Sequence, residues 1–333
     1  FDKIDVHALK RDYIFFTMLG GNDFVQHLYF LRMKEEHSFK VLKGVYQLLQ
    51  PKYGYLVDEN LNINQKFLEE YLIKLAQQER KWLIEKQKRF EDPEISKSSM
   101  AKYKDMMPWE KEWEIFQHTY YYKESHPLYE KYREEFNKID YKQQPNWKWK
   151  TQYYQEFFGI DYKNKKILNQ ICFDYLKSWY FALHYYLDEV PSWRWFYPYH
   201  ASPLPSDILT TIKRIKDINK VFKFQKGKPY QPLEQLMLVL PQKTDILGNK
   251  FKNIMKKYPQ FYPERFKLDV LWGQKYIYSE PKLPNIDSRI ILKEMSKLKL
   301  NAKEKELNQV NPELKASWHL RLLMIFLDLA TGY

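Results

Sequence analysis

The sequence has little of what several protein classes require. Its single cysteine, Cys172, excludes an internal disulfide framework and a cysteine-based zinc site. Only 9 glycines occur among 333 residues, and they form no Walker-type or dinucleotide-type loop. The 8 histidines are scattered, without a pair at the spacing of helical metal ligands. These shortages argue against a disulfide-stapled protein, a glycine-rich nucleotide fold and a histidine–cysteine metal centre.

Long hydrophobic runs are missing too. The densest run, residues 322–327, is far shorter than the roughly 18 apolar residues that a membrane-spanning helix needs. We therefore expect no membrane partner and no signal peptide. Because a lone thiol fits a reducing compartment, we expect an intracellular protein, in the cytoplasm or the nucleus. The sequence starts at Phe1 and stops at Tyr333 within patterned sequence, which predicts a fragment cut at one or both ends.

Aromatic residues and positive charge are abundant instead. Aromatic residues make up 18% of the chain, with 28 Tyr, 21 Phe and 10 Trp. This many rings can bury enough area to offset chain entropy, which excludes disorder as the main state. The formal net charge of +13 attracts polyanions. Nucleic acid is the first candidate partner and an acidic membrane surface the second, whereas a solvated lysine-rich surface needs no partner at all.

Apolar spacings of three and four residues predict a mainly α fold with a few short strands. Pro51 is expected to end one helix, and Asn64 and Asp207 are expected to begin others. The polar stretch 91–108 is interpreted as a possible mobile linker, and residues 109–150 are expected to be irregular and partly helical. Strands and turns are expected at 262–287. The expected helices cover residues 9–19, 38–49, 64–89, 165–187, 207–224, 233–240 and 318–329.

The first place for chemistry is the Gly-Gly-Asn-Asp segment at 20–23. A carboxylate directly after a glycine turn is held at a fixed angle and is little crowded, and Mg²⁺ prefers carboxylate oxygen. Asp23 is therefore a candidate metal ligand. The alternative is a helix C-cap followed by an Asx turn, which needs no ligand.

The second place is the proline-bounded aromatic loop, residues 191–200, with the sequence PSWRWFYPYH. It holds five aromatic residues, Arg194 and His200. Aromatic faces and a guanidinium stack on nucleic-acid bases whatever their sequence. Trp193 and Trp195 are accordingly candidate stacking residues. The alternative is a buried aromatic plug with one or two exposed rings.

A third place is basic. Seven Lys or Arg residues face a single acid, Asp217, across residues 211–228. Lys213, Lys216 and Lys220 are predicted to share one helical face, which is a possible phosphate track. A solvated helix surface is the alternative. Cys172 lies on a predicted apolar face and is interpreted as a core residue, not as a nucleophile.

Several segments, in order, resemble the XRN family of 5′→3′ exoribonucleases. Residues 11–24, RDYIFFTMLGGNDF, are similar to the family's GNDF motif and the helix before it. Residues 192–207, SWRWFYPYHASPLPSD, look like its SWxWxYPYHYAP…SD loop, and this motif is very specific. Shorter matches follow at 232–241 and 261–263. The resemblance covers about residues 5–310. It implies the end of a FEN/PIN-like nuclease core at 1–50, a helical domain at 51–260, and a C-terminal part at 261–333.

The resemblance also implies a function and roles for these residues. In the family the Asp of GND is a metal ligand among clustered carboxylates, where Mg²⁺ (or Mn²⁺) ions assist phosphodiester hydrolysis. This role is carried over to Asp23. A Trp of the SWxW loop stacks on the RNA near its 5′ end, and we carry this over to Trp193 or Trp195. The implied substrate is 5′-monophosphorylated single-stranded RNA, degraded processively.

This sequence departs from the family in ways that matter for activity. The family's other carboxylates lie upstream of GND, whereas only Asp2, Asp5 and Asp12 precede Asp23 here. The chain by itself is therefore expected to be inactive, and to need an upstream nuclease half in cis or in trans. Gln26 stands where the family usually has proline. Such departures leave a non-catalytic RNA-binding or scaffold paralogue as the alternative. A flap-type DNA nuclease shares the carboxylate but not the aromatic loop.

Overall fold

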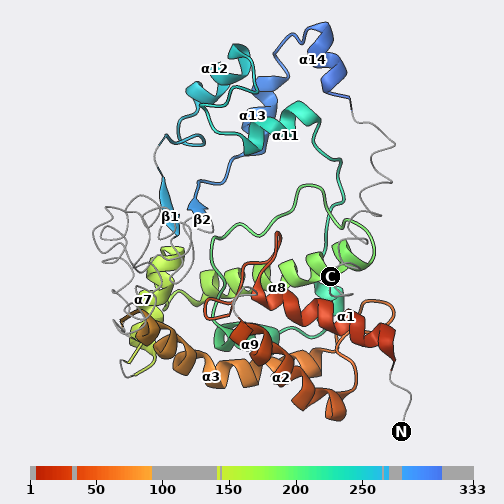
Figure 1. Ribbon diagram of the computed structural model, residues 1–333, viewed down its shortest axis with the longest axis vertical. Helices are drawn as coiled ribbons and strands as arrows, with labels where there is room; N and C mark the ends of the chain where they lie inside the picture. Colours follow the sequence, from red (N-terminus) through yellow and green to blue (C-terminus); the bar gives the residue numbers. More distant parts are fainter. Residues whose placement is uncertain are drawn as a thin grey trace, which may run out of the picture. The chain divides into compact units, whose positions relative to one another are not determined.

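The computed structural model describes most of the chain, and its elements are almost all helices (Figure 1), which confirms the mainly α fold class. The described residues form two compact units. The first contains those up to Gly227 together with those within 268–281, and the second contains those within 228–267 and from Lys282 onward. The described residues are 5–31, 36–91, 141–142, 145–264, 266–269 and 280–309.

The first unit is built around two long helices, α3 and α8. Helix α3 packs against α2 and α9, while α8 packs against α1 and α9. Figure 1 shows these helices gathered together. The elements are α1 (Val6–Thr17), the 3-10 turn η1 (Met18–Gly20), α2 (Glu36–Tyr53), α3 (Gln65–Glu91), α7 (Trp147–Phe158), α8 (Lys165–Leu187), α9 (Pro205–Ile212) and α10 (Ile218–Val221).

The second unit has a small core of its own. Helices α11 and α12 both pack against α13, around buried Met237, Phe251, Met255 and Ile291. Strands β1 and β2 pair in a two-stranded sheet, most of whose residues belong to the first unit, in the region where short strands were predicted. The elements after Gly227 are α11 (Pro232–Val239), α12 (Asn249–Lys257), β1 (Lys267–Asp269), β2 (Glu280–Lys282), α13 (Ser288–Met295) and α14 (Ala302–Leu307).

Aromatic residues dominate the core of the first unit, and their polar atoms find partners there. The hydroxyl of Tyr71 donates to the Leu42 carbonyl at 2.7 Å, and that of Tyr46 to the Asp12 carboxylate at 2.7 Å. Asp12 also accepts two backbone N–H groups, from Leu56 and Val57. A buried tyrosine thus adds a large apolar area without leaving its hydroxyl unpaired. Cys172 is buried as well, and burial raises the pKa of its thiol. It is the core residue that the sequence predicts.

Side-chain caps explain why several helix boundaries are predictable. Helix α8 begins after Asn164, whose side chain accepts from the Ile167 N–H, and it ends at Leu187 as predicted. Asn64 caps α3 in the same way, through the Phe67 N–H. The predicted end of α2 before Pro51 is wrong, because the helix includes Pro51 in its last turn. Pro51 has no N–H to donate to the Gln47 carbonyl, so the helix loses one bond there. It continues only to Tyr53, and Gly54 closes it at φ 74°.

The helix predicted at 207–224 is two shorter helices. Helix α9 begins at Pro205, so Asp207 lies in its first turn and is not the cap; the helix ends at Ile212. Asp217 then caps α10 by accepting from the Asn219 N–H at 3.0 Å. Aspartate favours this position because its side chain satisfies a free N–H at a helix start, and this local bond competes with a continuous helix.

Other predictions have different outcomes. The proposed linker at 91–108 begins at the last residue of α3, and its remainder lies outside the described residues. So do the stretch 109–140 and the helix expected at 318–329. Among the described residues, no helix combines the length and apolarity needed to cross a membrane.

Candidate nucleic-acid interface

The turn after α1 presents Asp23 to solvent. Gly21 adopts φ 92°, and a Cβ there would lie 2.8 Å from the Cβ of His27, so both the backbone angle and the space require glycine. Asn22 forms the Asx turn, because its Oδ1 accepts from the N–H groups of Phe24 and Val25 at 2.8 Å each. Asn22 therefore makes an Asx turn, as the alternative interpretation of this segment expects, and the next residue, Asp23, is exposed.

Asp23 by itself does not make a metal site. Within the described residues its carboxylate takes part in no hydrogen bond or ion pair, and no group of three or more His, Cys, Asp or Glu could hold a metal ion. Its negative charge contributes to the raised pKa values of two tyrosines of α8, Tyr185 and Tyr186. Burial raises the pKa of Tyr186 to about 12, and the charge of Asp23 adds to this rise. The described residues thus offer one oxygen ligand and do not fit a two-metal centre.

Ring contacts on α8 connect the Asp23 turn with the aromatic loop. Phe24 lies 4.3 Å from Tyr185 and 5.6 Å from Phe181, measured between ring centroids. Phe181 also contacts Trp195, at 5.3 Å. The C-terminal half of α8 therefore contacts both the turn that holds Asp23, through Phe24, and one of the candidate stacking residues, Trp195.

Backbone and side-chain bonds fix the start of the aromatic loop. The Trp193 N–H donates to the Lys226 carbonyl at 2.8 Å, and the Ser192 hydroxyl donates to the Gln225 carbonyl at 2.7 Å. The same hydroxyl accepts from the N–H groups of Arg194 and Trp195. The loop is thus tied to the 225–226 segment before its rings begin.

The two tryptophans of the loop have different surroundings. Trp195 packs against Phe181 and against Phe224, each at 5.3 Å, and the Lys177 ammonium lies 5.3 Å from its ring. Desolvation lowers the pKa of Lys177, which fits its position over these rings. Trp193 is 42% exposed. Of the two, Trp193 is the indole available to a ligand.

The other loop residues follow the prediction of a partly buried plug. Tyr197 is buried, with its hydroxyl donating to the Ala201 carbonyl at 2.9 Å, whereas Phe196 is exposed. Arg194 and His200 are exposed too. The Arg194 stem passes Gly227, where a Cβ would lie 3.6 Å from its Cγ. The loop therefore presents two rings, a guanidinium and an imidazole on a fixed backbone.

The basic segment does not form the predicted single helical face. Lys213 is the C-cap of α9, Lys216 lies between the helices, and Lys220 belongs to α10, because Asp217 begins a new helix. Lys220 is paired with Asp217 at 3.0 Å. The predicted phosphate track along one helix is therefore wrong in its geometry, although all three lysines are exposed.

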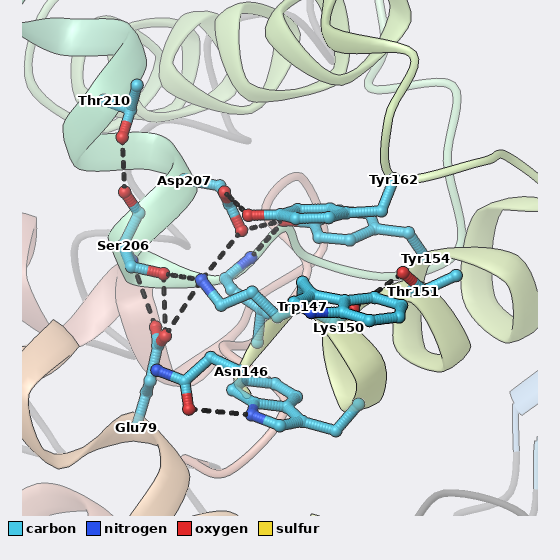
Figure 2. Close-up of polar contacts among 12 residues, drawn as sticks. Glu79, Asn146, Trp147, Lys150, Thr151, Tyr154, Tyr162, Ser206, Asp207 and Thr210 are labelled. Atoms are coloured by element: carbon cyan, nitrogen blue, oxygen red, sulfur yellow. Dashed lines mark hydrogen bonds and ion pairs between the residues drawn. The ribbon is translucent and has the colours of Figure 1, made fainter. Parts of the chain in front are cut away.

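A buried charge cluster, which was not predicted from the sequence, joins α3, α7 and the first turn of α9 (Figure 2). The Lys150 ammonium lies 3.3 Å from the Glu79 carboxylate and 3.4 Å from that of Asp207. Ser206 donates to Glu79 through its N–H at 3.0 Å and its hydroxyl at 2.7 Å. Burial raises the pKa of Glu79, and the charge of Lys150 opposes this rise. A sequence signal existed: Glu79 continues the apolar register of Leu72 and Leu75.

Comparison with known proteins places the chain in a family. A family model described as the Xrn1 helical domain matches residues 117–316, which is more than half of the 333 residues. The chain belongs to the XRN family. This membership confirms the resemblance drawn from the GNDF segment and the aromatic loop.

Individual relatives agree with the family assignment. Human 5′-3′ exoribonuclease 1 is 26% identical over 354 residues, an alignment that covers 99% of this chain and 20% of the relative. The 5′-3′ exoribonuclease 2 of Emericella nidulans is 34% identical over 151 residues, covering 44% of this chain and 14% of the relative. The 5′-3′ exoribonuclease 1 of Saccharomyces cerevisiae is 27% identical over 179 residues, covering 52% and 11%. This XRN chain spans a fifth or less of each of these relatives.

Proposed function

We propose that the intact protein is a 5′→3′ exoribonuclease that degrades 5′-monophosphorylated single-stranded RNA. The curated XRN relatives are named 5′-3′ exoribonucleases, and the finer substrate is what the family resemblance implies. The observation that supports the proposal for this chain is the exposed Trp193, in a loop whose start is fixed by Ser192 and Lys226. A preordered aromatic surface beside Arg194 binds bases without a large ordering cost. The net charge of +13 attracts the RNA backbone.

Asp23 is proposed as one oxygen ligand for Mg²⁺ (or Mn²⁺) in the intact enzyme. Its exposure and the absence of a competing partner among the described residues are compatible with that role. The remaining ligands are proposed to come from the upstream nuclease half, as the family resemblance implies. The chain of 333 residues is accordingly proposed to bind RNA without cleaving it. We further propose an intracellular location, in the cytoplasm or the nucleus.

Substituting Trp193 should weaken RNA binding, whereas substituting Trp195 should lower the stability of the fold. Trp193→Ala is expected to weaken RNA binding about 5- to 150-fold, because stacking contributes about 1–3 kcal/mol per base. Its effect on the free energy of unfolding should stay within about 0.5 kcal/mol, since the ring is exposed. Trp195→Ala should instead destabilise the fold by at least about 2 kcal/mol, because its ring packs against Phe181 and Phe224.

The measurement is an anisotropy titration with labelled 5′-monophosphorylated single-stranded RNA, together with urea unfolding of the same samples. Trp147→Ala is a matched control for the loss of an exposed indole outside the loop, and it should leave the RNA affinity unchanged. Unchanged RNA affinity in Trp193→Ala would remove the support for RNA binding at this loop.

A further inference from the structure

The chain that follows the aromatic loop is held by hydroxyl groups of α7. We call residues 201–204 the loop tail. Tyr153 donates its hydroxyl hydrogen to the Ser202 carbonyl at 2.8 Å, and the Leu204 N–H donates to the Tyr154 hydroxyl oxygen at 3.1 Å. All four tail residues are buried. The aromatic loop thus has a second fixed end, opposite to the one that Ser192 provides.

Tyr154 connects this loop tail to the buried charge cluster. Its hydroxyl accepts from Leu204 and donates to the Asp207 carboxylate at 2.9 Å, so both its hydrogen-bonding roles are used. Asp207 in turn is held by Lys150, which pairs with Glu79. A continuous series of polar contacts therefore runs from Glu79 to Leu204 in the loop tail, and Figure 2 shows its part from Glu79 through Lys150 and Asp207 to Tyr154.

Tyr162 contacts the same carboxylate but not the loop tail. It donates to the other oxygen of Asp207 at 3.0 Å, and its ring is stacked on that of Tyr154 at 5.4 Å. The Lys165 ammonium lies 3.3 Å from its ring centroid. The two tyrosines thus share an acceptor and a stack, while Tyr154 alone of the pair binds Leu204. The two tyrosines therefore allow the hydrogen bond to Asp207 to be tested separately from the hydrogen bond to the loop tail.

We propose that Tyr153 and Tyr154 are positioning residues, which hold the aromatic loop in its RNA-binding arrangement through the loop tail. Neither touches RNA in this proposal; Tyr154 acts through Leu204, with its hydroxyl oriented by Asp207. The inference rests on the proposed function, because it assigns these residues to RNA binding at that loop. Its physical basis is that an N–H buried without an acceptor is costly, so Leu204 stays in place only while the Tyr154 oxygen accepts its hydrogen bond.

The test compares Tyr154→Phe with Tyr162→Phe in the full 333-residue chain. Each variant removes one hydroxyl that donates to Asp207, and only the first also removes the acceptor of Leu204. We measure the affinity for 5′-monophosphorylated single-stranded RNA below the melting transition, and amide hydrogen exchange of peptides covering residues 191–204. We expect Tyr154→Phe to weaken RNA binding about 5- to 10-fold and to speed exchange in those peptides alone, and Tyr162→Phe to change affinity less than about twofold.

Two results would overturn the positioning role proposed for Tyr154. Equal effects of the two variants, or unchanged exchange at 191–204 in Tyr154→Phe, overturn it, because the hydroxyls would then serve stability alone. If the wild-type chain binds no RNA, the proposed function fails, and the exchange comparison still decides whether Tyr154 holds the loop. Should Tyr154→Phe not reach the native circular dichroism spectrum, Tyr153→Phe takes its place. It removes the other contact to the tail, and it should speed exchange in the same peptides.

Discussion

Replacing Lys150 by Met is expected to lower the free energy of unfolding by about 3–5 kcal/mol. Lys150 is the cation between the carboxylates of Glu79 and Asp207, and all three side chains are buried. Met fills a similar volume, so the loss comes from leaving two buried negative charges without their counter-charge. Asp207 keeps its hydrogen bonds from Tyr154 and Tyr162, and Glu79 keeps those from Ser206, but neutral donors do not replace the ammonium.

The loss of unfolding free energy in Lys150→Met should also depend on pH. The pKa of Glu79 is already raised by burial, and removing Lys150 takes away the charge that opposes this rise. A carboxyl whose pKa is higher in the folded state takes up a proton on folding, so its destabilising effect lessens as the pH falls through the raised pKa. The difference between variant and wild type should therefore shrink as the pH falls from neutral toward the ordinary glutamate pKa of 4.5.

Urea unfolding at several pH values measures this difference. Lys148→Met is the matched control, since Lys148 is an exposed lysine of the same helix. Adding Glu79→Gln to Lys150→Met should recover part of the stability, because one of the two carboxylates is removed. A loss below about 1 kcal/mol in Lys150→Met, or one that does not vary with pH, would contradict the buried ion-pair arrangement.

Replacing Asp23 by Asn in the intact protein should reduce RNA decay at least about a hundredfold. The change removes one negatively charged oxygen ligand proposed for the metal and keeps the shape of the side chain. Stability should hardly change, because Asn22 and not Asp23 makes the bonds of the turn. RNA binding through the aromatic loop should persist, so the variant is expected to bind without degrading.

Decay of 3′-labelled RNA on denaturing gels measures this effect, with binding measured in parallel. Asp188→Asn, an exposed carboxylate at the C-terminal end of α8, is the matched control. Undiminished decay in Asp23→Asn would reject the metal assignment. If the intact wild type degrades no RNA under the same conditions, the alternative of a non-catalytic RNA-binding paralogue is favoured.

Local signals in the sequence predicted the elements that depend on local physics. The bounds of α8 follow from apolar spacing and the Asn164 cap, and the start of α3 follows from Asn64. Two predictions were wrong: Asp217 begins α10 inside a stretch predicted to be one helix, and α2 continues two residues past Pro51 to Tyr53. The prediction that Lys213, Lys216 and Lys220 share one helical face was wrong because it depended on that single helix.

The arrangement around the aromatic loop could be predicted only in part. The motif identified the loop, and sequence alone did not separate Trp193 from Trp195, because the difference arises from Phe181 and Phe224. The charge cluster depends on residues far apart in sequence: Lys150 lies 57 positions from Asp207, and Ser206 lies 127 from Glu79. A single sequence contains no signal that pairs such residues, although a glutamate in the apolar register of α3 indicates that a buried partner exists.

RNA binding at the aromatic loop is best tested by whether the 333-residue chain retards RNA on a gel. The 333-residue chain and its Trp193→Ala variant are each mixed with 3′-labelled, 5′-monophosphorylated single-stranded RNA and Mg²⁺, and each tube is run on native and denaturing gels. We expect retarded, intact RNA with the wild type and a large loss of retardation with Trp193→Ala. Equal retardation by the two proteins, or none by the wild type, would contradict RNA binding at the aromatic loop. RNA decay that EDTA stops would contradict the proposal that further metal ligands come from outside this sequence.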